Sequence, residues 1–341
     1  MRLYSNEIVF RGHPDKVCDQ ISDAILDACL ENDKNSRCGI EVVGGKGKIF
    51  ITGEITSTAT PNVEAITKRV LLDVGYHANY EIIDNIGHQS PDIALGTNDE
   101  VGGAGDQGMM FGYATSETPQ RLPKAMVILQ EFSERYDHLR KYHPDIFRPD
   151  GKAQITGYYD ENMHLKRIKT ATISYQNSET DRDSSDARIR YEFETICAKY
   201  GVEVEQYLIN PTGRFEIGGF EGDAGLTGRK IVVDTYHSFA PVGGGAFSGK
   251  DPTKVDRSGA YKARQMAKEV INNLPVKWCT VQLSYAIGVA EPLAIYVETD
   301  AGPLAVDPSV YRNCTPAIII DHLRLKEIKY EELARFGHFR E

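Results

Sequence analysis

The same order of predicted helices and strands occurs three times along this sequence, and this repetition limits the folds that the chain can adopt. In the first occurrence, apolar residues recur at helical spacing over residues 15–32, and a glycine-rich turn at residues 44–47 precedes an alternating run over residues 48–59. Pro61 then begins a second predicted helix that reaches Gly75. The first unit is therefore predicted to contain a helix, a β-hairpin and a helix.

Two further units repeat this order. The second is predicted to have a helix over residues 122–142, strands within 153–176 around a turn at 160–162, and a helix over 185–200. The third is predicted to have a helix over residues 257–274, strands within 280–299 and a helical stretch over 308–323. We therefore expect an α+β fold built from three structurally similar units.

A chain of 341 residues is longer than one hydrophobic core usually fills, so two or three domains are expected. No low-complexity linker separates the units, which indicates that they share interfaces. Residues 87–108 are rich in Gly, Asp and Pro, as is typical of mobile loops. We expect an N-terminal domain over 1–95, a mobile active-site loop and linker over 96–108, a central domain over 109–217 and a C-terminal domain over 218–341.

The charge and hydropathy of the chain argue against two classes of partner. A net charge of −10 is opposite to the broad basic faces with which proteins bind nucleic acids and anionic membranes. No apolar run approaches the roughly 20 residues that cross a bilayer, and the first residues lack the apolar stretch of a signal peptide. We therefore expect a cytoplasmic protein with no nucleic-acid or membrane partner.

The six cysteines form no CxxC pair and no zinc-ligand spacing, and most lie in apolar patterns. We expect them to be buried, reduced thiols.

The first motif with chemical potential is GHPDK at residues 12–16, where a loop meets a predicted helix. Helix starts favour phosphate and other anions, because their N–H groups are unpaired and the helix dipole is positive there. His13 could donate a hydrogen bond to a phosphate, Asp15 could hold a divalent metal, and Lys16 could add positive charge. Pro14 and Asp15 are also ordinary residues at a helix start, and the short string alone favours that structural role.

Two long glycine-rich segments strengthen the case for an anion site. The segment GGFEGDAGLTGRK, residues 218–230, contains Asp223, Arg229 and Lys230. The segment GGGAFSGKDPTKVDRS, residues 243–258, contains Lys250, Lys254 and Asp256 and leads into a predicted helix. Glycines allow a close approach of backbone to ligand, although they also form simple turns. Local basic residues in an acidic chain predict one polyanion site.

Two familiar nucleotide motifs are rejected. Residues 244–250 have the GxxxxGK spacing of a P-loop, but Asp251 stands where a P-loop needs Ser or Thr, and no buried strand precedes the segment. Residues 103–108 satisfy GxGxxG, but no strand precedes them and no βαβ unit surrounds them.

The remaining candidates are single polar residues in short motifs, and each alone is more often a solvated or capping residue. Glu41 and Glu54 are expected on opposite limbs of the first hairpin, where they could share a cation or ammonium group. The others are Gln89, Asp92, Asp106, Lys152, Arg214 and Phe215.

Taken together, the motifs resemble the S-adenosylmethionine synthetase family. They occur in the family's order from about residue 7 to residue 339: GHPDK, GEIT, QSPDI, GAGDQG, FGYATSET, NPTGRF, GDAGLTGRK and GGGAFSGKDPTKVDRS. The resemblance implies three related α+β units with pseudo-threefold symmetry. It also implies a homodimer with active sites between subunits, and dimers of this family often pair into tetramers. The implied substrates are ATP and L-methionine, and the implied cofactors are Mg²⁺, two per site, and K⁺.

The resemblance also implies a role for each candidate residue. The implied catalytic residues are His13, Arg229, Lys250 and Lys254. The implied Mg²⁺ ligands are Asp15 and Asp256, and the implied K⁺ ligand is Glu41. The implied groups for ATP and its triphosphate are His13, Asp106, Lys152, Arg214, Arg229, Lys230 and Lys250. The implied methionine pocket consists of Glu54, Gln89, Phe215, Asp223 and Lys254. The segment from Gln89 to Asp106 matches the family's mobile loop over the site.

Some positions depart from the family pattern. Phe10 and Arg11 precede GHPDK where Ser and Glu are usual, so an added positive charge is expected beside the triphosphate site. The segments from Glu54 to Asp106 are shortened. Two other functions compete with synthesis of S-adenosylmethionine: a non-catalytic relative that binds a nucleotide or a partner, and a kinase that transfers the γ-phosphoryl group of ATP.

Overall fold

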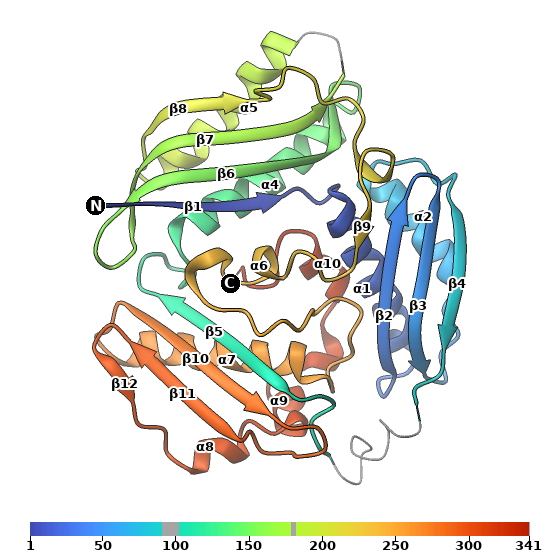
Figure 1. Cartoon of the computed structure of the whole chain (residues 1–341), viewed down its shortest axis with the longest axis vertical. Helices are drawn as coiled ribbons and strands as arrows, with labels where there is room; N and C mark the ends of the chain where they lie inside the picture. The colour runs from blue at the N-terminus through green and yellow to red at the C-terminus, as the bar shows by residue number, and fades with distance from the viewer. Residues whose placement is uncertain (91–101, 179–181, 341) are drawn as a thin grey trace.

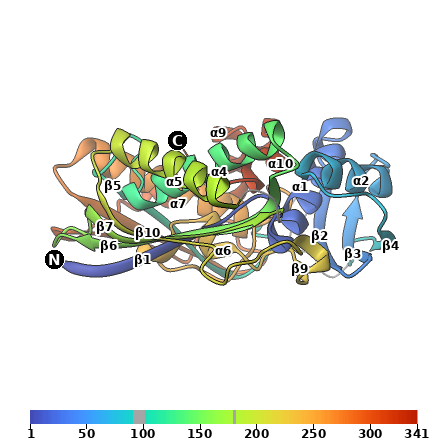
Figure 2. The ribbon, with the colours of Figure 1, turned by 90° about the horizontal axis from the view of Figure 1, so that it is seen from above.

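The computed structural model describes residues 1–90, 102–178 and 182–340. Three four-stranded sheets surround a centre in which the short helices α6 and α10, from different parts of the chain, lie (Figure 1). Seen from above, α1, α2, α4 and α5 lie on one side of the molecule, and α6 and β9 lie on the strand side (Figure 2). The expected α+β class is confirmed.

The first sheet has the order β4-β3-β2-β9 and packs against α1 and α2. Its elements are α1 (Pro14–Asn32), β2 (Arg37–Gly45), β3 (Lys48–Thr56), α2 (Val63–Val74), β4 (Glu81–Gly87) and β9 (Gly225–Leu226). The predicted helix, hairpin and helix are confirmed. Helix α2 begins after Pro61, because the side chain of Asn62 caps it by accepting the N–H of Ala65 at 3.0 Å.

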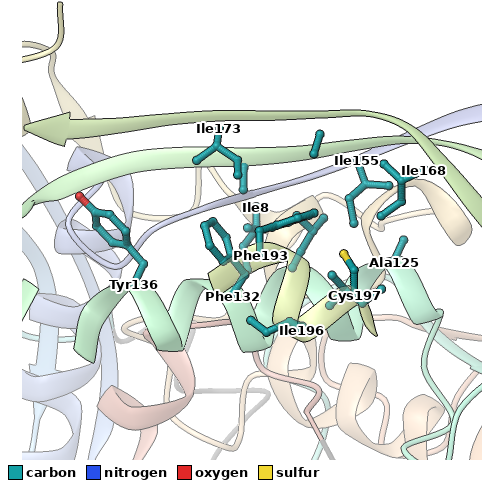
Figure 3. Packing of buried hydrophobic residues seen from close by; sticks show 14 of the residues in the cluster. Ile8, Ala125, Phe132, Tyr136, Ile155, Ile168, Ile173, Phe193, Ile196 and Cys197 are labelled. Carbon is teal, nitrogen blue, oxygen red and sulfur yellow. The ribbon is translucent and has the colours of Figure 1, made fainter. Parts of the chain in front are cut away.

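The second sheet has the order β1-β6-β7-β8, with α4 and α5 on one face. Its elements are β1 (Arg2–Val9), α4 (Lys124–Tyr142), β6 (Phe147–Tyr159), β7 (Leu165–Asn177), α5 (Arg182–Lys199) and β8 (Val204–Ile209). Figure 3 shows how Phe132 on α4 and Phe193 on α5 meet beneath Ile8 and Ile155 of the sheet. The two rings lie edge to face with centroids 5.0 Å apart.

The third sheet has the order β12-β11-β10-β5 and packs against α7. Its elements are β5 (Gly108–Thr115), α7 (Val255–Asn273), β10 (Trp278–Tyr285), β11 (Ala294–Thr299), β12 (Gly302–Leu304), α8 (Ser309–Arg312) and α9 (Pro316–His322). The helical stretch expected over residues 308–323 is present as two short helices, because α8 ends at Arg312 and α9 begins at Pro316. Pro316 starts a new helix, because proline cannot donate the hydrogen bond that would continue α8.

Short elements complete the chain. They are the 3₁₀ turns Gly219–Glu221, His237–Phe239 and Leu325–Glu327, helix α6 (Ile231–Asp234) and helix α10 (Tyr330–Ala334). All six cysteines are buried and free, as expected. In the described part of the chain, no helix is long and apolar enough to cross a membrane.

Each sheet takes one edge strand from a distant part of the sequence. Strand β1 pairs antiparallel with β6, β5 pairs antiparallel with β10, and β9 pairs antiparallel with β2. Strand pairing thus joins residues on opposite sides of the domain boundaries expected at residues 95, 108 and 217. The boundaries themselves stay predictions. The sequence did not predict these three edge strands.

Close packing of β5 on α7 predicts the effect of one small substitution. A β-carbon at Gly112 would lie 2.0 Å from the backbone carbon of Ala263. Gly112→Ala must therefore push α7 away from the sheet, and we expect a loss of about 3 kcal/mol in the free energy of unfolding, measured by urea titration. Gly87→Ala is the control, because the nearest atom lies 3.9 Å away. Equal stability of both variants would contradict this packing.

Candidate active site

The GHPDK motif forms the start of helix α1. His13 caps the helix, because its ring Nδ1 accepts a hydrogen bond from the backbone N–H of Asp15 at 3.2 Å. With Nδ1 as the acceptor, the proton of the neutral ring lies on Nε2. Burial and the charge of Lys230 lower the pKa of His13 to about 3. His13 is thus a neutral hydrogen-bond donor at physiological pH.

Asp15 joins this motif to the glycine-rich segment 218–230. Its carboxylate is fully buried and accepts the backbone N–H of Leu226 at 2.9 Å. The same carboxylate contacts Lys230 Nζ and lies 3.4 Å from Arg229 Nε. Two motifs that are far apart in the sequence therefore meet at one carboxylate.

The side chains of Lys152, Arg229 and Lys230 line an open cleft of about 600 Å³ beside β1 and β6. Besides burial and Lys230, the charges of Asp15, Lys152 and Asp223 act on the pKa of His13. We call this group the first cluster: His13, Asp15, Lys152, Asp223, Arg229 and Lys230. It contains three basic side chains and two acidic ones, whereas acidic residues outnumber basic ones in the whole chain.

A second cluster forms where the hairpin of β2 and β3 meets the segment before α7. Lys250 Nζ lies 2.5 Å from Asp256 Oδ2, and Lys254 Nζ lies 3.6 Å from Glu54 Oε1. The antiparallel register of the hairpin turns Glu41 and Glu54 to the same face. With Lys250 they line a pocket of about 280 Å³. We call this group the second cluster: Glu41, Glu54, Lys250, Lys254 and Asp256.

Asp251 fixes the backbone beside the second cluster, a role that the sequence did not indicate. Its fully buried carboxylate accepts the N–H of Cys38 at 2.8 Å and that of Thr253 at 2.9 Å. It also lies 3.2 Å from Lys254 Nζ. Helix α7 begins only at Val255. The segment is therefore pinned to the start of β2 and is not a P-loop.

Asp106 and Gln89 lie at the two ends of the expected loop. A β-carbon at Gly105 would lie 3.3 Å from the carbonyl oxygen of Thr253 and 3.7 Å from Cα of Lys254, so the exposed Asp106 follows a residue that lies beside the second cluster. Gln89 follows β4, and its backbone N–H donates to Thr56 Oγ1 at 3.3 Å. Asp92 and residues 96–101 of the loop lie outside the described residues.

Arg214 and Phe215 follow β8 at a turn. Arg214 is exposed, and its Nε lies 2.8 Å from Glu216 Oε1. Phe215 is half-buried, and its carbonyl accepts the N–H of Asn177 at 2.8 Å. The structure thus places these two candidates in a turn and records their contacts with the neighbouring chain.

Each cluster offers one carboxylate in the first turn of a helix for a divalent cation: Asp15 in α1 and Asp256 in α7. Within the described ranges, no group of three or more His, Cys, Asp or Glu side chains could hold a metal ion. Mg²⁺ commonly binds through one or two carboxylates together with waters and substrate phosphates. The donor sets therefore fit Mg²⁺ that arrives with a polyphosphate.

Models of the three domains of S-adenosylmethionine synthetase match the sequence in order. The N-terminal domain matches residues 1–91, the central domain residues 101–215 and the C-terminal domain residues 217–341. The chain belongs to the S-adenosylmethionine synthetase family. The resemblance found in the motifs is thereby confirmed.

Full-length relatives bear the family's name. A Petrotoga mobilis protein named S-adenosylmethionine synthase is 41% identical over 99% of this chain and 93% of its own length. A Clostridium tetani protein of the same name is 42% identical over 99% of this chain and 94% of its own length. The likeness to S-adenosylmethionine synthases therefore extends over all three units.

Two basic residues, one just before the GHPDK motif and one at its end, do not face the cleft. Arg11 is 2% exposed and pairs with Asp73 and Asp137, so the expectation of an added positive charge beside the phosphates is wrong. Lys16 is also buried, and its Nζ lies 2.5 Å from Asp234. Both charges are neutralised inside the protein, because an unpaired buried charge is costly.

The depressed pKa of His13 predicts a pH-dependent stability. The unfolded chain binds a proton at His13 near pH 6.5, whereas the folded chain binds it only near pH 3, so acidification between these values favours unfolding. His13→Asn keeps a capping oxygen and removes this titration. Below pH 6.5, we expect the wild type to lose up to about 1.4 kcal/mol per pH unit relative to the variant. Urea unfolding of both proteins at pH 7 and pH 5 measures their difference in stability. If this difference is the same at both pH values, folded His13 is protonated at pH 5 and its pKa is not lowered.

Proposed function

We propose that this chain forms S-adenosylmethionine from L-methionine and ATP. The methionine sulfur attacks C5′ of ATP, a sulfur–carbon bond forms, and the bond from C5′ to the triphosphate oxygen breaks. The released triphosphate is then hydrolysed to phosphate and pyrophosphate. The observation that carries this proposal is that Arg229 and Lys230 contact Asp15 and that Lys250 contacts Asp256, in a chain of net charge −10.

The residue types suit this reaction. A thioether is nucleophilic without deprotonation, so the site needs no general base, whereas the leaving triphosphate needs compensation for its negative charge. Arg229, Lys230, Lys250 and Lys254 supply positive charge, and neutral His13 supplies an N–H. We propose that His13, Arg229, Lys250 and Lys254 are the catalytic residues.

Two kinds of cation would complete the site. Asp15 and Asp256 would each hold a Mg²⁺ ion, which supplies charge neutralisation to the phosphates when bound. Their present partners, Lys230 and Lys250, are themselves proposed phosphate ligands and would turn to the phosphates. Glu41 would hold K⁺, because its carboxylate is exposed on the sheet face beside the 280 Å³ pocket.

The remaining assignments follow the family pattern. The proposed methionine pocket consists of Glu54, Gln89, Phe215, Asp223 and Lys254. The ion pair between Lys254 and Glu54 supports this pocket. The nucleoside side of ATP would contact Asp106, Lys152 and Arg214. The loop from Gln89 to Asp106 would cover the site, and its closure would align the sulfur with C5′ and exclude water.

We propose a homodimer whose subunits share each active site. In the described part of the chain, ion pairs join residues within each cluster and none joins the two clusters. The sheet faces turned away from the helices also expose apolar side chains, including Val43, Phe50, Met109 and Tyr296. Such faces mark protein interfaces. A second copy would cover them and bring the first cluster of one subunit to the second cluster of its partner.

Further assembly and symmetry stay proposals. In every sheet, an edge strand from elsewhere runs antiparallel to the first strand of a hairpin, which supports pseudo-threefold symmetry. The third unit departs from the pattern, because its edge strand β12 is antiparallel whereas β4 and β8 are parallel to their neighbours. Pairing of dimers into a tetramer and a cytoplasmic location are predictions from the sequence.

A product assay separates this function from its alternatives. The chain is incubated with ATP, Mg²⁺, K⁺ and methionine, and the nucleotide and phosphate products are separated by chromatography. We expect S-adenosylmethionine, phosphate and pyrophosphate, all dependent on methionine. Formation of ADP would indicate a kinase instead, and no turnover would indicate a binding protein.

Mixed dimers test the shared site. Lys230→Met disables the first cluster and Lys250→Ala the second, and each variant alone should lose about 10²–10³ in kcat. In a dimer with one chain of each kind, one of the two sites combines two intact halves, so activity should return. A mixture of Lys230→Met with Arg229→Met is the control, because both changes fall in the same cluster. No recovery in isolated mixed dimers would place each site within one chain.

A further inference from the structure

Arg11 lies at the junction of three helices, inside the protein. Its guanidinium donates to Asp73 on α2 at 2.6 Å, to Asp137 on α4 at 3.3 Å and to Gln20 on α1 at 3.1 Å. The side chain is 2% exposed. Gln20 returns a hydrogen bond to the Arg11 carbonyl at 2.7 Å. Both the side chain and the backbone of Arg11 are therefore fixed.

The residues on either side of Arg11 are held as tightly. Phe10 stacks on Tyr136 of α4, with ring centroids 4.3 Å apart. The carbonyl of Gly12 accepts the hydroxyl of Tyr76 at 2.6 Å, and a β-carbon at Gly12 would lie 2.3 Å from Pro149. The segment from Phe10 to Gly12 is thus clamped between the first and second units.

This clamped segment leads directly to the first cluster. The backbone N–H of His13 donates to the carbonyl of Phe10 at 2.9 Å, so Phe10, Arg11, Gly12 and His13 form one closed turn. Asp15 follows in the first turn of α1. A shift of the turn would therefore move the His13 ring and the Asp15 carboxylate together.

The guanidinium also neutralises carboxylates that belong to different units. Burial raises the pKa of Asp137 and of Asp73, but the neighbouring bases, with Arg11 the foremost at each carboxylate, together outweigh burial, so both pKa values are lowered. Arg140 and Lys141 also pair with Asp137, and Arg335 lies 3.6 Å from Asp73. Only Arg11, among these bases, bridges both carboxylates in the described structure. Arg140 of α4 also donates to the backbone carbonyl of Asp73 on α2, at 3.1 Å. Loss of the Arg11 charge would therefore leave α2 and α4 linked, but it would leave the two carboxylates without the base that they share at the turn.

We propose that Arg11 is a positioning residue for the reaction, which acts through the Phe10–His13 turn to hold His13 and Asp15 against the triphosphate. This inference rests on the proposed function. It assigns to Arg11 no contact with substrate. Small displacements of such groups can lower a rate by about 10²-fold.

The test compares Arg11→Met with a matched variant elsewhere. Arg264 is also buried, at 4% exposure, and donates to the carbonyls of Tyr113, Gln120 and Arg121 at 2.7, 2.8 and 3.0 Å. Arg264→Met removes a similarly buried guanidinium whose hydrogen-bond partners belong to neither the first nor the second cluster. We expect both variants to unfold at lower temperature, and only Arg11→Met to lose about 10²-fold in kcat/KM for ATP.

If Arg11→Met does not fold, two more conservative variants test the same role of Arg11. Arg11→Lys retains a charge that can reach one carboxylate, and should recover part of the lost kcat/KM. Asp73→Asn leaves Arg11 paired with Asp137 and should lower kcat/KM in the same direction by a smaller factor. Both are assayed at saturating methionine, with kcat and the KM for ATP measured separately.

Three outcomes would overturn the inference. They are a folded Arg11→Met or Arg11→Lys with wild-type kcat/KM, a folded Asp73→Asn with wild-type kcat/KM, and an equal kinetic loss in Arg264→Met. Failure of the wild type to form S-adenosylmethionine would instead overturn the proposed function. The two failures are therefore distinguishable.

Discussion

A row of four aspartates along helix α1 organises the site. They follow one another at every fourth position, and each accepts a backbone N–H from another segment. Asp15 binds Leu226 at 2.9 Å, Asp19 binds Gly228 at 2.8 Å, Asp23 binds Gly249 at 2.8 Å and Asp27 binds Tyr330 at 2.9 Å. Like charges at this spacing repel, and burial raises the pKa of Asp27 to about 6. The helix therefore depends on the segments that it binds, and both glycine-rich motifs take their places from it.

The sequence indicated the long elements well, because each carries its own pattern. The spacing of apolar residues predicted α1, α4 and α7, and the alternation predicted the three hairpins. The strands β1, β5 and β9 were missed, because what makes them strands is a partner far away: β9, for example, consists of Gly225 and Leu226 and pairs with Gly44 and Val43. Pairing of that kind leaves no periodicity in the local sequence.

The candidate site shows the same division. Glycine-framed motifs indicated which residues carry charge, and the structure brings His13, Asp15, Arg229 and Lys230 together. The sequence could not show which charged side chains are buried and paired with opposite charges inside the protein. Arg11 was expected beside the phosphates, but its partners Asp73 and Asp137 lie 62 and 126 positions further along the chain. Whether a basic residue faces a ligand or a carboxylate is decided by tertiary packing.

The exchanged edge strands have a consequence for how the chain is made. Strand β1 leaves the ribosome first, but its partner β6 is not complete until residue 159 has been added, and β2 waits for β9 until residue 226. The nascent chain must therefore carry unpaired strand edges through most of its synthesis, a state in which β-structure is prone to associate wrongly. None of the three sheets can close before a distant part of the chain has emerged. The third sheet waits for β12, which ends at Leu304, so the fold can be assembled only after all three hairpins have been made.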